Sequence, residues 1–390
     1  MNDQELRALV KAQREWIIEK RRQLHRIPER GFAEFKTQKV IMDALEEIGI
    51  PYKTERTWVI GLIEGGRPGE VVALRADMDA LPLEEPDGCP FRSEHPGMMH
   101  ACGHDAHMAI LLGAAKVLYG IRDQLRGSVK LLFQPAEETE GGALPMVEAG
   151  AMEDPHVDRV YGLHVMPRLP LGVVETRAGT LNASTDTVHL TIHGKAGHGA
   201  YPESSTDAIV CAAQVITALQ TLVSRNLSPL ESAVLSIGMI EGGTAGNIIC
   251  DKVTMRGTLR TANSELRAMM KRRIRETAEG VALAMGCRAE VIIDSGYAAL
   301  VNDSAEAARV RRVAARLLGE ENAVEKDAPS MGGEDFSFFS DCVPGAFFHL
   351  GCVNASKMPA PPLHSRDFDL DEECLTIGVM MHAALVLDGQ

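Results

Sequence analysis

The sequence predicts an α/β fold: a central mixed sheet flanked by helices, with a smaller α+β domain inserted into it. Strand-length apolar runs alternate with helix-length runs over the first part of the chain, which is typical of α/β domains. Near residue 184 the pattern changes to half-exposed strands and two long helices, and near residue 296 the α/β pattern returns. We therefore expect one domain over residues 1–184 plus 296–390 and an inserted domain over residues 185–295.

Helices at the start of the chain are indicated by apolar residues at helical spacing with charges between them. The first is expected over residues 3–26, ahead of Pro28, and the second over residues 37–48, ending at Gly49. A glycine-rich turn over 65–69 separates the first two strands. The expected strands are 58–63, 71–75, 128–134, 160–165 and 346–350. Further helices are expected after the stretch 99–107, ending at about residue 119, and over residues 305–318 and 372–387.

The inserted segment reads as strand, helix, two strands, helix and strand. The expected strands are 186–192, 233–240, 253–260 and 288–293, and the expected helices are 204–222 and 264–285. This β-α-β-β-α-β order implies a small antiparallel sheet with two helices on one face.

Composition limits the classes of partner. The formal net charge of −14 over 390 residues argues against nucleic acid or an anionic membrane as a partner. The polar N-terminus does not resemble a signal peptide, and we expect no apolar run of the roughly 20 residues that span a membrane. Eight cysteines without a C-x-x-C pair indicate reduced thiols. These features predict a cytoplasmic enzyme.

The stretch from Met99 to His107 carries the densest chemistry of the chain. His100, Cys102 and His104 lie directly ahead of an apolar run with helical spacing. Thiolate and imidazole are the ligands that bind borderline cations such as zinc at neutral pH. The alternative is a histidine-rich loop that binds no ligand.

Further candidate ligands follow the ends of the predicted strands. Asp77 and Asp79 follow the second strand, where they are either ligands or turn residues. Glu137 and Glu138 follow the next one, where they either divide the work of ligand and base or form a solvated acidic loop. His164 lies within an apolar strand, as a ligand or as a buried core histidine. Strand ends in open α/β sheets are where ligands bind, which favours the functional interpretation.

Seven ordered motifs together resemble one known family. They are R-A-D-M-D-A-L-P (75–82), M-H-A-C-G-H-D-A-H (99–107), Q-P-A-E-E (134–138), G-L-H-V (162–165), G-K-A-G-H-G-A-Y-P (194–202), M-G-G-E-D-F (331–336) and L-H-S (363–365). The set is similar to the amidohydrolase branch of the aminoacylase/carboxypeptidase metallopeptidase family, which includes hippurate hydrolase and the plant auxin-amino-acid hydrolases.

The resemblance implies a site with two divalent metal ions, which are zinc, manganese, nickel, cobalt or iron. Cys102 would bridge the ions. His104 and His164 would serve one ion, and Glu138 and His364 would surround the other, with the pairing left open. Glu137 would be the general base that takes a proton from water.

The inserted domain resembles the lid of that family. His198 would donate a hydrogen bond to the reacting carbonyl oxygen, from its own or a partner subunit. Asn247 and Arg260 would hold the carboxylate of the substrate, although Arg260 fits equally well as a surface salt-bridge partner. The resemblance also implies a homo-oligomer formed through the lid.

Two departures separate the chain from the peptidase branches. Those branches have histidine at the position of Asp77, and they have aspartate in the bridging role that Cys102 would take in this chain. Asp77 is therefore not expected to be a ligand, and Asp79 is expected to orient one. His100 and His107 are expected to support the motif structurally.

The expected activity is hydrolysis of the amide bond of an N-acyl amino acid, a small-molecule substrate, to a carboxylate and a free amino acid. The alternative activity is that of a metal-dependent dipeptidase or carboxypeptidase. A third possibility is a ligand-binding protein on the same scaffold, which retention of Glu137 and of the metal ligands argues against.

Overall fold

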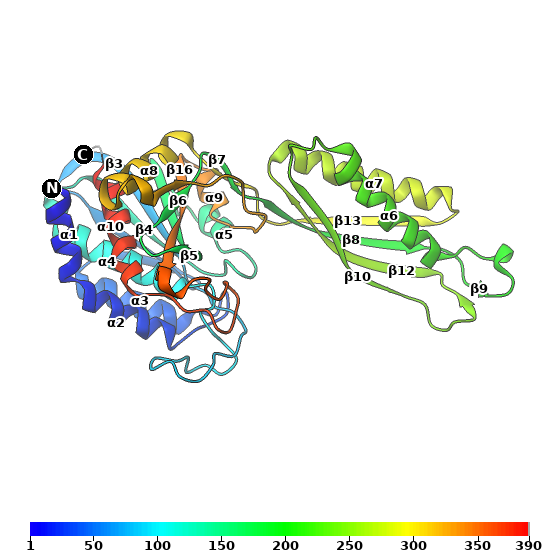
Figure 1. The fold of residues 1–390 in the computed structure, drawn as a ribbon, viewed down its shortest axis with the longest axis horizontal. Helices are drawn as coiled ribbons and strands as arrows, with labels where there is room; N and C mark the ends of the chain where they lie inside the picture. Colours follow the sequence, from blue (N-terminus) through cyan, green and yellow to red (C-terminus); the bar gives the residue numbers. More distant parts are fainter. Residues whose placement is uncertain (389–390) are drawn as a thin grey trace. The chain divides into compact units, whose positions relative to one another are not determined.

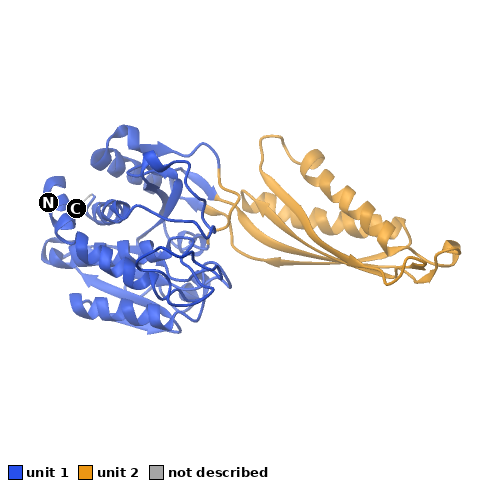
Figure 2. Cartoon of the chain, turned by 60° about the horizontal axis from the view of Figure 1, so that its bottom comes forward, with its two compact units in different colours: residues 1–181, 301–328, 335–390 blue, residues 182–300, 329–334 orange. Residues whose placement is uncertain are grey.

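The computed structural model describes residues 1–388. The chain forms two compact units, coloured separately in Figure 2. Unit 1 contains residues 1–181, 301–328 and 335–388, and unit 2 contains residues 182–300 and 329–334.

Unit 1 is built on an eight-stranded sheet with the order β1-β2-β4-β3-β5-β16-β6-β15. Its strands are β1 (Tyr52–Glu55), β2 (Trp58–Glu64), β3 (Arg67–Asp77), β4 (Arg126–Gln134), β5 (Arg159–Pro170), β6 (Val174–Thr176), β15 (Ala323–Glu325) and β16 (Gly345–Val353). β4, β3, β5 and β16 run parallel to one another, whereas β1, β2 and β6 introduce antiparallel pairs. The predicted mixed central sheet is therefore confirmed. Because the parallel strands share one direction, their carboxyl ends meet at a single edge.

The helices of unit 1 flank this sheet (Figure 1). They are α1 (Asp3–Ala12), α2 (Arg14–His25), α3 (Phe35–Ile48), α4 (His104–Gly120), α5 (Ala143–Glu148), α8 (Ser304–Leu318), α9 (Ser337–Ser340) and α10 (Glu373–Leu387). α4 and α10 are almost entirely buried and pack together through glycines. A Cβ atom at Gly113 would lie 2.7 Å from Val379, and one at Gly378 would lie 2.6 Å from Ile110. This close packing fixes the helix whose first residue is His104.

Two elements of unit 1 differ from the expectation. The helix expected over residues 3–26 is interrupted at Gln13, whose amide bonds to Val10 O at 3.0 Å, a three-residue rather than a four-residue step. β3 begins at Arg67 rather than at Val71. The glycine-rich segment there is extended because Gly69 and Gly127 allow the backbones of β3 and β4 to approach closely.

Unit 2 contains a four-stranded antiparallel sheet with the order β10-β12-β8-β13. Its elements are β8 (Ser184–His193), α6 (Ala208–Asn226), β10 (Ala233–Gly242), β12 (Lys252–Thr261), α7 (Ser264–Ala284) and β13 (Arg288–Ser295). Both helices cover one face of the sheet, as Figure 1 shows. β8 alternates buried and half-buried residues along its length, the pattern of a strand with one covered face.

Two very short strands complete unit 2: β9 (Gly197–His198) pairs with β11 (Ile248–Ile249). By length and composition alone, α6 is apolar enough to cross a membrane, although no such run was expected from the sequence. Its buried face, which includes Cys211, Val215 and Leu219, packs in the core of unit 2, as a core helix does.

Candidate active site

Five segments of unit 1 bring the candidate site residues together. Asp77 ends β3, and the loop after β4 carries Glu137 and Glu138. His164 lies on β5, next in the sheet to β3, and Cys102 and His104 lie at the start of α4. His364 comes from a distant loop that is tied to the motif, since its amide donates to Ala101 O at 2.9 Å.

A first group of ligand atoms comes from Cys102, His104 and His164, all within 4.8 Å of one another. Cys102 Sγ lies 3.3 Å from His164 Nε2. His164 Nδ1 donates to Val165 O at 2.7 Å and His104 Nδ1 donates to Asp79 O at 2.9 Å, so the Nε2 lone pair of each ring faces the group. Among the described residues, the buried His104 Nε2 has no hydrogen-bond partner, which is the arrangement a metal ligand requires.

A second group comes from Cys102, Glu138 and His364, also within 4.8 Å of one another. His364 Nε2 lies 3.3 Å from Cys102 Sγ and 2.9 Å from Glu138 Oε1. The Cys102 sulfur belongs to both groups. Glu137 and Glu138 form a further cluster with His104. Sulfur, imidazole and carboxylate in two groups that share one atom fit two adjacent borderline divalent cations.

Charge around these groups favours a cation. Burial lowers the pKa of His104, but the carboxylates of Asp77 and Asp79 outweigh it and raise that pKa to about 10. Burial raises the pKa of the Cys102 thiol well above its usual range, and the Glu138 and Glu137 carboxylates add to the effect. A divalent cation binds both residues in their deprotonated forms, so metal binding is expected to release protons.

Asp79 and His107 support the site without facing it as ligands. The Asp79 carboxylate accepts the amides of Glu137 and Glu138 at 3.1 and 3.0 Å. His107 Nδ1 donates to Asp77 Oδ1 at 2.6 Å, and its Nε2 accepts the Val165 amide at 2.9 Å. Both ring nitrogens of His107 are therefore engaged, which leaves no lone pair for a metal.

Two supporting features were not predicted from the sequence. Arg75 is fully buried and bonds to Gln134 Oε1, Asp77 Oδ2 and Asp335 Oδ1 at 2.7, 2.8 and 2.9 Å. Glu34 is also buried and accepts the amide of Ala136 at 3.0 Å. Gln134 and Asp335 lie inside motifs identified in the sequence, but the sequence did not predict their hydrogen-bond partners. No pattern in the sequence indicated a role for Glu34.

The candidate residues of unit 2 lie in two places. β9 and β11 put His198 beside Ile248, and Gly199 donates to Asn247 O at 2.8 Å, so His198 and Asn247 are neighbours. His198 is exposed, and its Nδ1 accepts the Ala200 amide at 3.1 Å. Arg260 lies on β12, near the end of that strand distant from β11, and burial lowers its pKa.

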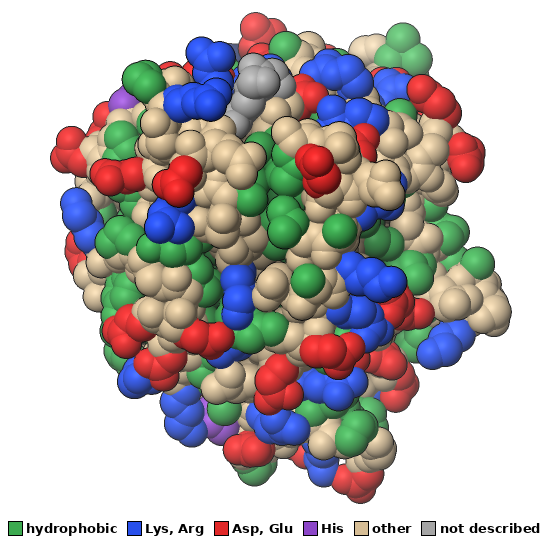
Figure 3. Space-filling view, turned by 90° about the vertical axis from the view of Figure 1, so that its left-hand side faces the viewer, with side chains coloured by type: hydrophobic (Ala, Val, Ile, Leu, Met, Phe, Trp, Pro, Cys, Tyr) green, Lys and Arg blue, Asp and Glu red, His purple; other side chains and the backbone are tan. Residues whose placement is uncertain are grey.

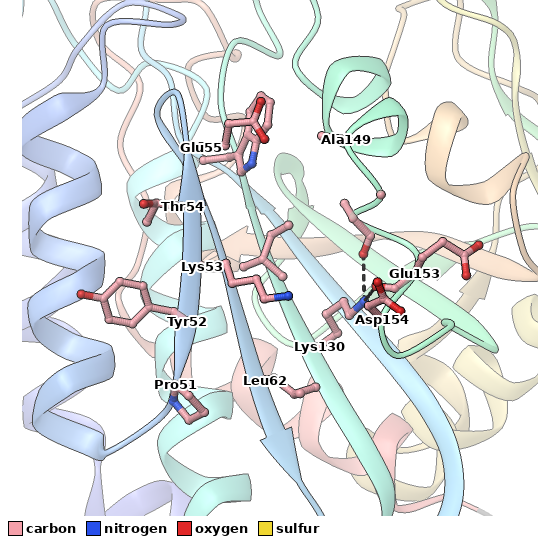
Figure 4. A pocket seen from close by; sticks show the side chains of 14 residues that line it. Pro51, Tyr52, Lys53, Thr54, Glu55, Leu62, Lys130, Ala149, Glu153 and Asp154 are labelled. Atoms are coloured by element: carbon pink, nitrogen blue, oxygen red, sulfur yellow. Dashed lines mark hydrogen bonds between the residues drawn. The ribbon is translucent and has the colours of Figure 1, made fainter.

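Another concave surface of unit 1 lies over β1, β2 and β4, with a cavity of about 420 Å³ (Figure 4). Lys130 contributes to its wall, and its Nζ donates to Ala151 O, Glu153 O and Pro155 O at 3.1, 2.6 and 2.9 Å. An ammonium group has three donors, and all are used to fasten the loop after α5. Lys130 therefore has a structural role in this cavity.

The fold and the site together define a metal-dependent hydrolase with two adjacent ligand groups. The chain belongs to peptidase family M20/M25/M40, whose model matches residues 73–388.

Relatives of the chain act on amide bonds. The chain is 41% identical over 377 residues to IAA-amino acid hydrolase ILR1-like 4 of Arabidopsis thaliana, covering 95% of this chain and 85% of the relative. It is 43% identical over 337 residues to N-acetyl-L-cysteine deacetylase of Bacillus subtilis strain 168, covering 86% and 80%. It is 38% identical over 384 residues to thermostable carboxypeptidase 2 of Saccharolobus solfataricus, covering 97% and 96%.

A solved structure extends the similarity to the fold. It is a dinuclear metal-binding peptidase of the M20 family from Bacillus subtilis, with a TM-score of 0.84 and 36% identity over 97% of this chain and 98% of that one. The predicted family, the mixed α/β fold and the requirement for two metal ions are confirmed. This chain is a metal-dependent hydrolase of amide bonds.

Proposed function

We propose that this chain hydrolyses N-acyl amino acids to a carboxylate and a free amino acid. The observation that carries the proposal is the shared Cys102 sulfur between two ligand groups, with Glu137 clustered beside His104 and Glu138. The relatives named IAA-amino acid hydrolase and N-acetyl-L-cysteine deacetylase support the same substrate class.

The proposed roles follow from the chemistry of each side chain. Two divalent cations held by Cys102, His104, His164, Glu138 and His364 would lower the pKa of the attacking water and stabilise charge on the carbonyl oxygen. Glu137 accepts a proton from the water at its carboxylate and delivers it to the amide nitrogen as the carbon–nitrogen bond breaks. Asp79 holds the backbone of Glu137 and Glu138 in place for these steps.

The residues of unit 2 complete the proposal. His198 donates to the carbonyl oxygen, and Asn247 or Arg260 binds the substrate carboxylate. Asn247 directly precedes β11, while Arg260 lies eight residues after Lys252, the first residue of β12, which is about 26 Å along that strand at roughly 3.3 Å per residue. A small carboxylate cannot contact both within one unit, so both contribute to one site only if a second copy supplies one of them. A homo-oligomer is therefore part of the proposal in which both residues bind the same carboxylate.

The first test is a panel of N-acetyl-, N-benzoyl- and long-chain-acyl amino acids together with dipeptides. Metal-loaded protein is expected to release amino acid from acyl substrates, whereas chelated protein and Glu137→Gln are expected to be inactive. The matched control is Glu140→Gln, an exposed carboxylate three residues further along. Release from dipeptides alone would instead favour the dipeptidase or carboxypeptidase activity, which the carboxypeptidase relative represents.

A second test addresses the oligomer. Mixed oligomers of His198→Ala and Glu137→Gln, each inactive alone, are expected to regain activity if His198 acts across subunits. If native mass spectrometry shows hybrids and activity stays absent, His198 acts in its own chain.

On the face shown in Figure 3, acidic and basic side chains are interspersed. The cytoplasmic location and the identity of the metal stay predictions.

A further inference from the structure

Three consecutive backbone amides in the loop after β4 are held by two buried carboxylates. The Ala136 amide donates to Glu34 Oε1 at 3.0 Å. The next two, of Glu137 and Glu138, donate to the two oxygens of Asp79 at 3.1 and 3.0 Å. The loop that presents the proposed base and a proposed ligand is thus fixed through its backbone from two sides.

The conformation of this loop is one that the chain does not adopt without support. Ala136 has a φ of +57°, the left-handed region that a residue with a Cβ atom rarely occupies. Two glycines pack closely against this loop. A Cβ atom at Gly31 would lie 2.8 Å from Ala136 Cα, and one at Gly142 would lie 1.9 Å from Pro135 O, so the neighbouring backbone leaves the loop little room to move. Rotation of the peptide before Ala136 would move the backbone of Glu137, so the Glu34 hydrogen bond helps to fix the backbone from which the Glu137 side chain extends.

Glu34 is itself held in place. It has no exposed surface, and Thr57 Oγ1 donates to its Oε2 at 2.7 Å. Thr57 is 1% exposed and lies in the turn between β1 and β2. Within residues 1–388, Glu34 forms no ion pair with Lys, Arg or His, so its two oxygens serve hydrogen bonds rather than a charge partner. A carboxylate buried in this way is costly unless its hydrogen bonds are made.

We propose that Glu34, oriented by Thr57, is a positioning residue for the general base Glu137. The inference rests on the proposed function, and it adds a residue that neither binds metal nor touches substrate. Because Asp79 keeps the next two amides, loss of Glu34 loosens the loop without releasing it. The effect therefore falls on turnover more than on substrate binding.

The test compares Glu34→Ala, Glu34→Gln and Thr57→Val in the metal-loaded protein. Glu34→Ala is expected to lower kcat by about 10- to 100-fold, the order of loss that follows a displacement of about 1 Å in a catalytic group, with KM changed less than about threefold. Glu34→Gln is expected to recover most of the kcat, because its amide oxygen still accepts from Ala136 and the Thr57 hydroxyl can turn to accept from its amide nitrogen. Thr57→Val is nearly isosteric and is expected to show a smaller loss.

Glu306→Ala is the matched control, because Glu306 is also a buried glutamate, 5% exposed, and it accepts a hydrogen bond from Tyr161 Oη on another part of unit 1. It is expected to lower thermal stability without a selective loss of kcat. If Glu34→Ala keeps wild-type kcat, or loses activity only in proportion to metal content, the proposal is wrong. If Glu34→Ala does not fold, Thr57→Val decides by the same criteria.

Amide hydrogen exchange over residues 135–141 separates this inference from the proposed function. Faster exchange of the Ala136 amide in Glu34→Ala, but not in Glu306→Ala, supports the positioning role even if the panel contains no substrate for the wild type. Unchanged exchange overturns it whether or not the enzyme is active.

Discussion

Replacing Arg75 by methionine is expected to destabilise unit 1 strongly. Arg75 donates to Gln134, Asp77 and Asp335 at 2.7, 2.8 and 2.9 Å, and none of the side chains of Arg75, Asp77 and Asp335 is exposed. Methionine fills much of the volume but leaves two buried carboxylates without this cation.

The magnitude follows from the bonds that are lost. Each charge-assisted hydrogen bond contributes about 1.5–3 kcal/mol, and removal of one partner of a buried ion pair costs about 3–5 kcal/mol. Asp77 keeps His107, and Asp335 keeps Gln134 and the Ala143 amide, so the lower half of the range applies. We expect a loss of about 3–4 kcal/mol, which corresponds to a Tm lower by roughly 10 °C for a domain of this size.

Two signatures test the cause as well as the size. Burial already raises the pKa of Asp335 in spite of Arg75, and the pKa is expected to rise further when Arg75 is removed. In the variant Asp335 is therefore expected to take up a proton as pH falls from 8 to 5. The difference in unfolding free energy between the wild type and the variant is expected to shrink over the same range. Adding Asp335→Asn to Arg75→Met is expected to raise the Tm above that of the single variant, because it removes one of the unpaired charges.

The assay is urea unfolding followed by circular dichroism, in chelated protein so that metal binding does not contribute. A loss below about 1 kcal/mol, or a double variant less stable than Arg75→Met, would refute the reasoning.

Three further changes address the site itself. Cys102→Ser replaces the shared thiolate with a poorer ligand, so metal content measured by mass spectrometry is expected to fall by half or more; two ions per chain would contradict the bridging role. Gly103→Ala places a Cβ atom 2.4 Å from Val165 at a φ of +83°, and should lower the free energy of unfolding by about 2 kcal/mol in urea, whereas an unchanged midpoint would exclude this strain. Burial raises the pKa of Glu34 to about 7, above its value in the unfolded chain, so the folded state holds this proton more tightly. The free energy of unfolding that this proton contributes is complete below about pH 4.5 and is lost as pH rises through 7, a fall of about 3 kcal/mol. Glu34→Gln should lack this fall, and parallel curves of stability against pH for the variant and the wild type would refute the reasoning.

The sequence predicted the residues whose partners are close along the chain. Cys102 and His104 are two positions apart at the start of a helix, and Glu137 and Glu138 are adjacent after a strand, so local pattern was enough to mark them. Arg75 lies on β3 and Asp335 in the turn before α9, 260 residues apart, so their contact depends on how distant parts of unit 1 pack together. Periodicity reports which face of an element is buried, but it carries no information about sheet order.

The short elements escaped prediction for a different reason. β9 and β11 are two residues each, too short to show any alternation, yet their pairing is what places His198 beside Asn247. The bridging role of Cys102 came from family resemblance, and geometry supports it only through the ligand atoms that gather around the sulfur. A sequence pattern can indicate a candidate ligand, whereas the distances between ligand atoms are needed to show which candidates could bind the same ion.

The carboxylates of this site show what separates a ligand from a support. In the sequence, Asp77, Asp79 and Glu138 are equivalent acids that follow strands. In the structure, Asp77 faces Arg75 and His107, and Asp79 accepts two backbone amides, so the acceptor capacity of both is directed toward protein donors. Glu138 instead has an oxygen 2.9 Å from His364 Nε2, beside the Cys102 sulfur, and in the proposed site both of these side chains would bind a cation. The chemical type of a side chain makes it a candidate for catalysis. Whether its carboxylate oxygen can bind a cation depends on the hydrogen-bond donors around it.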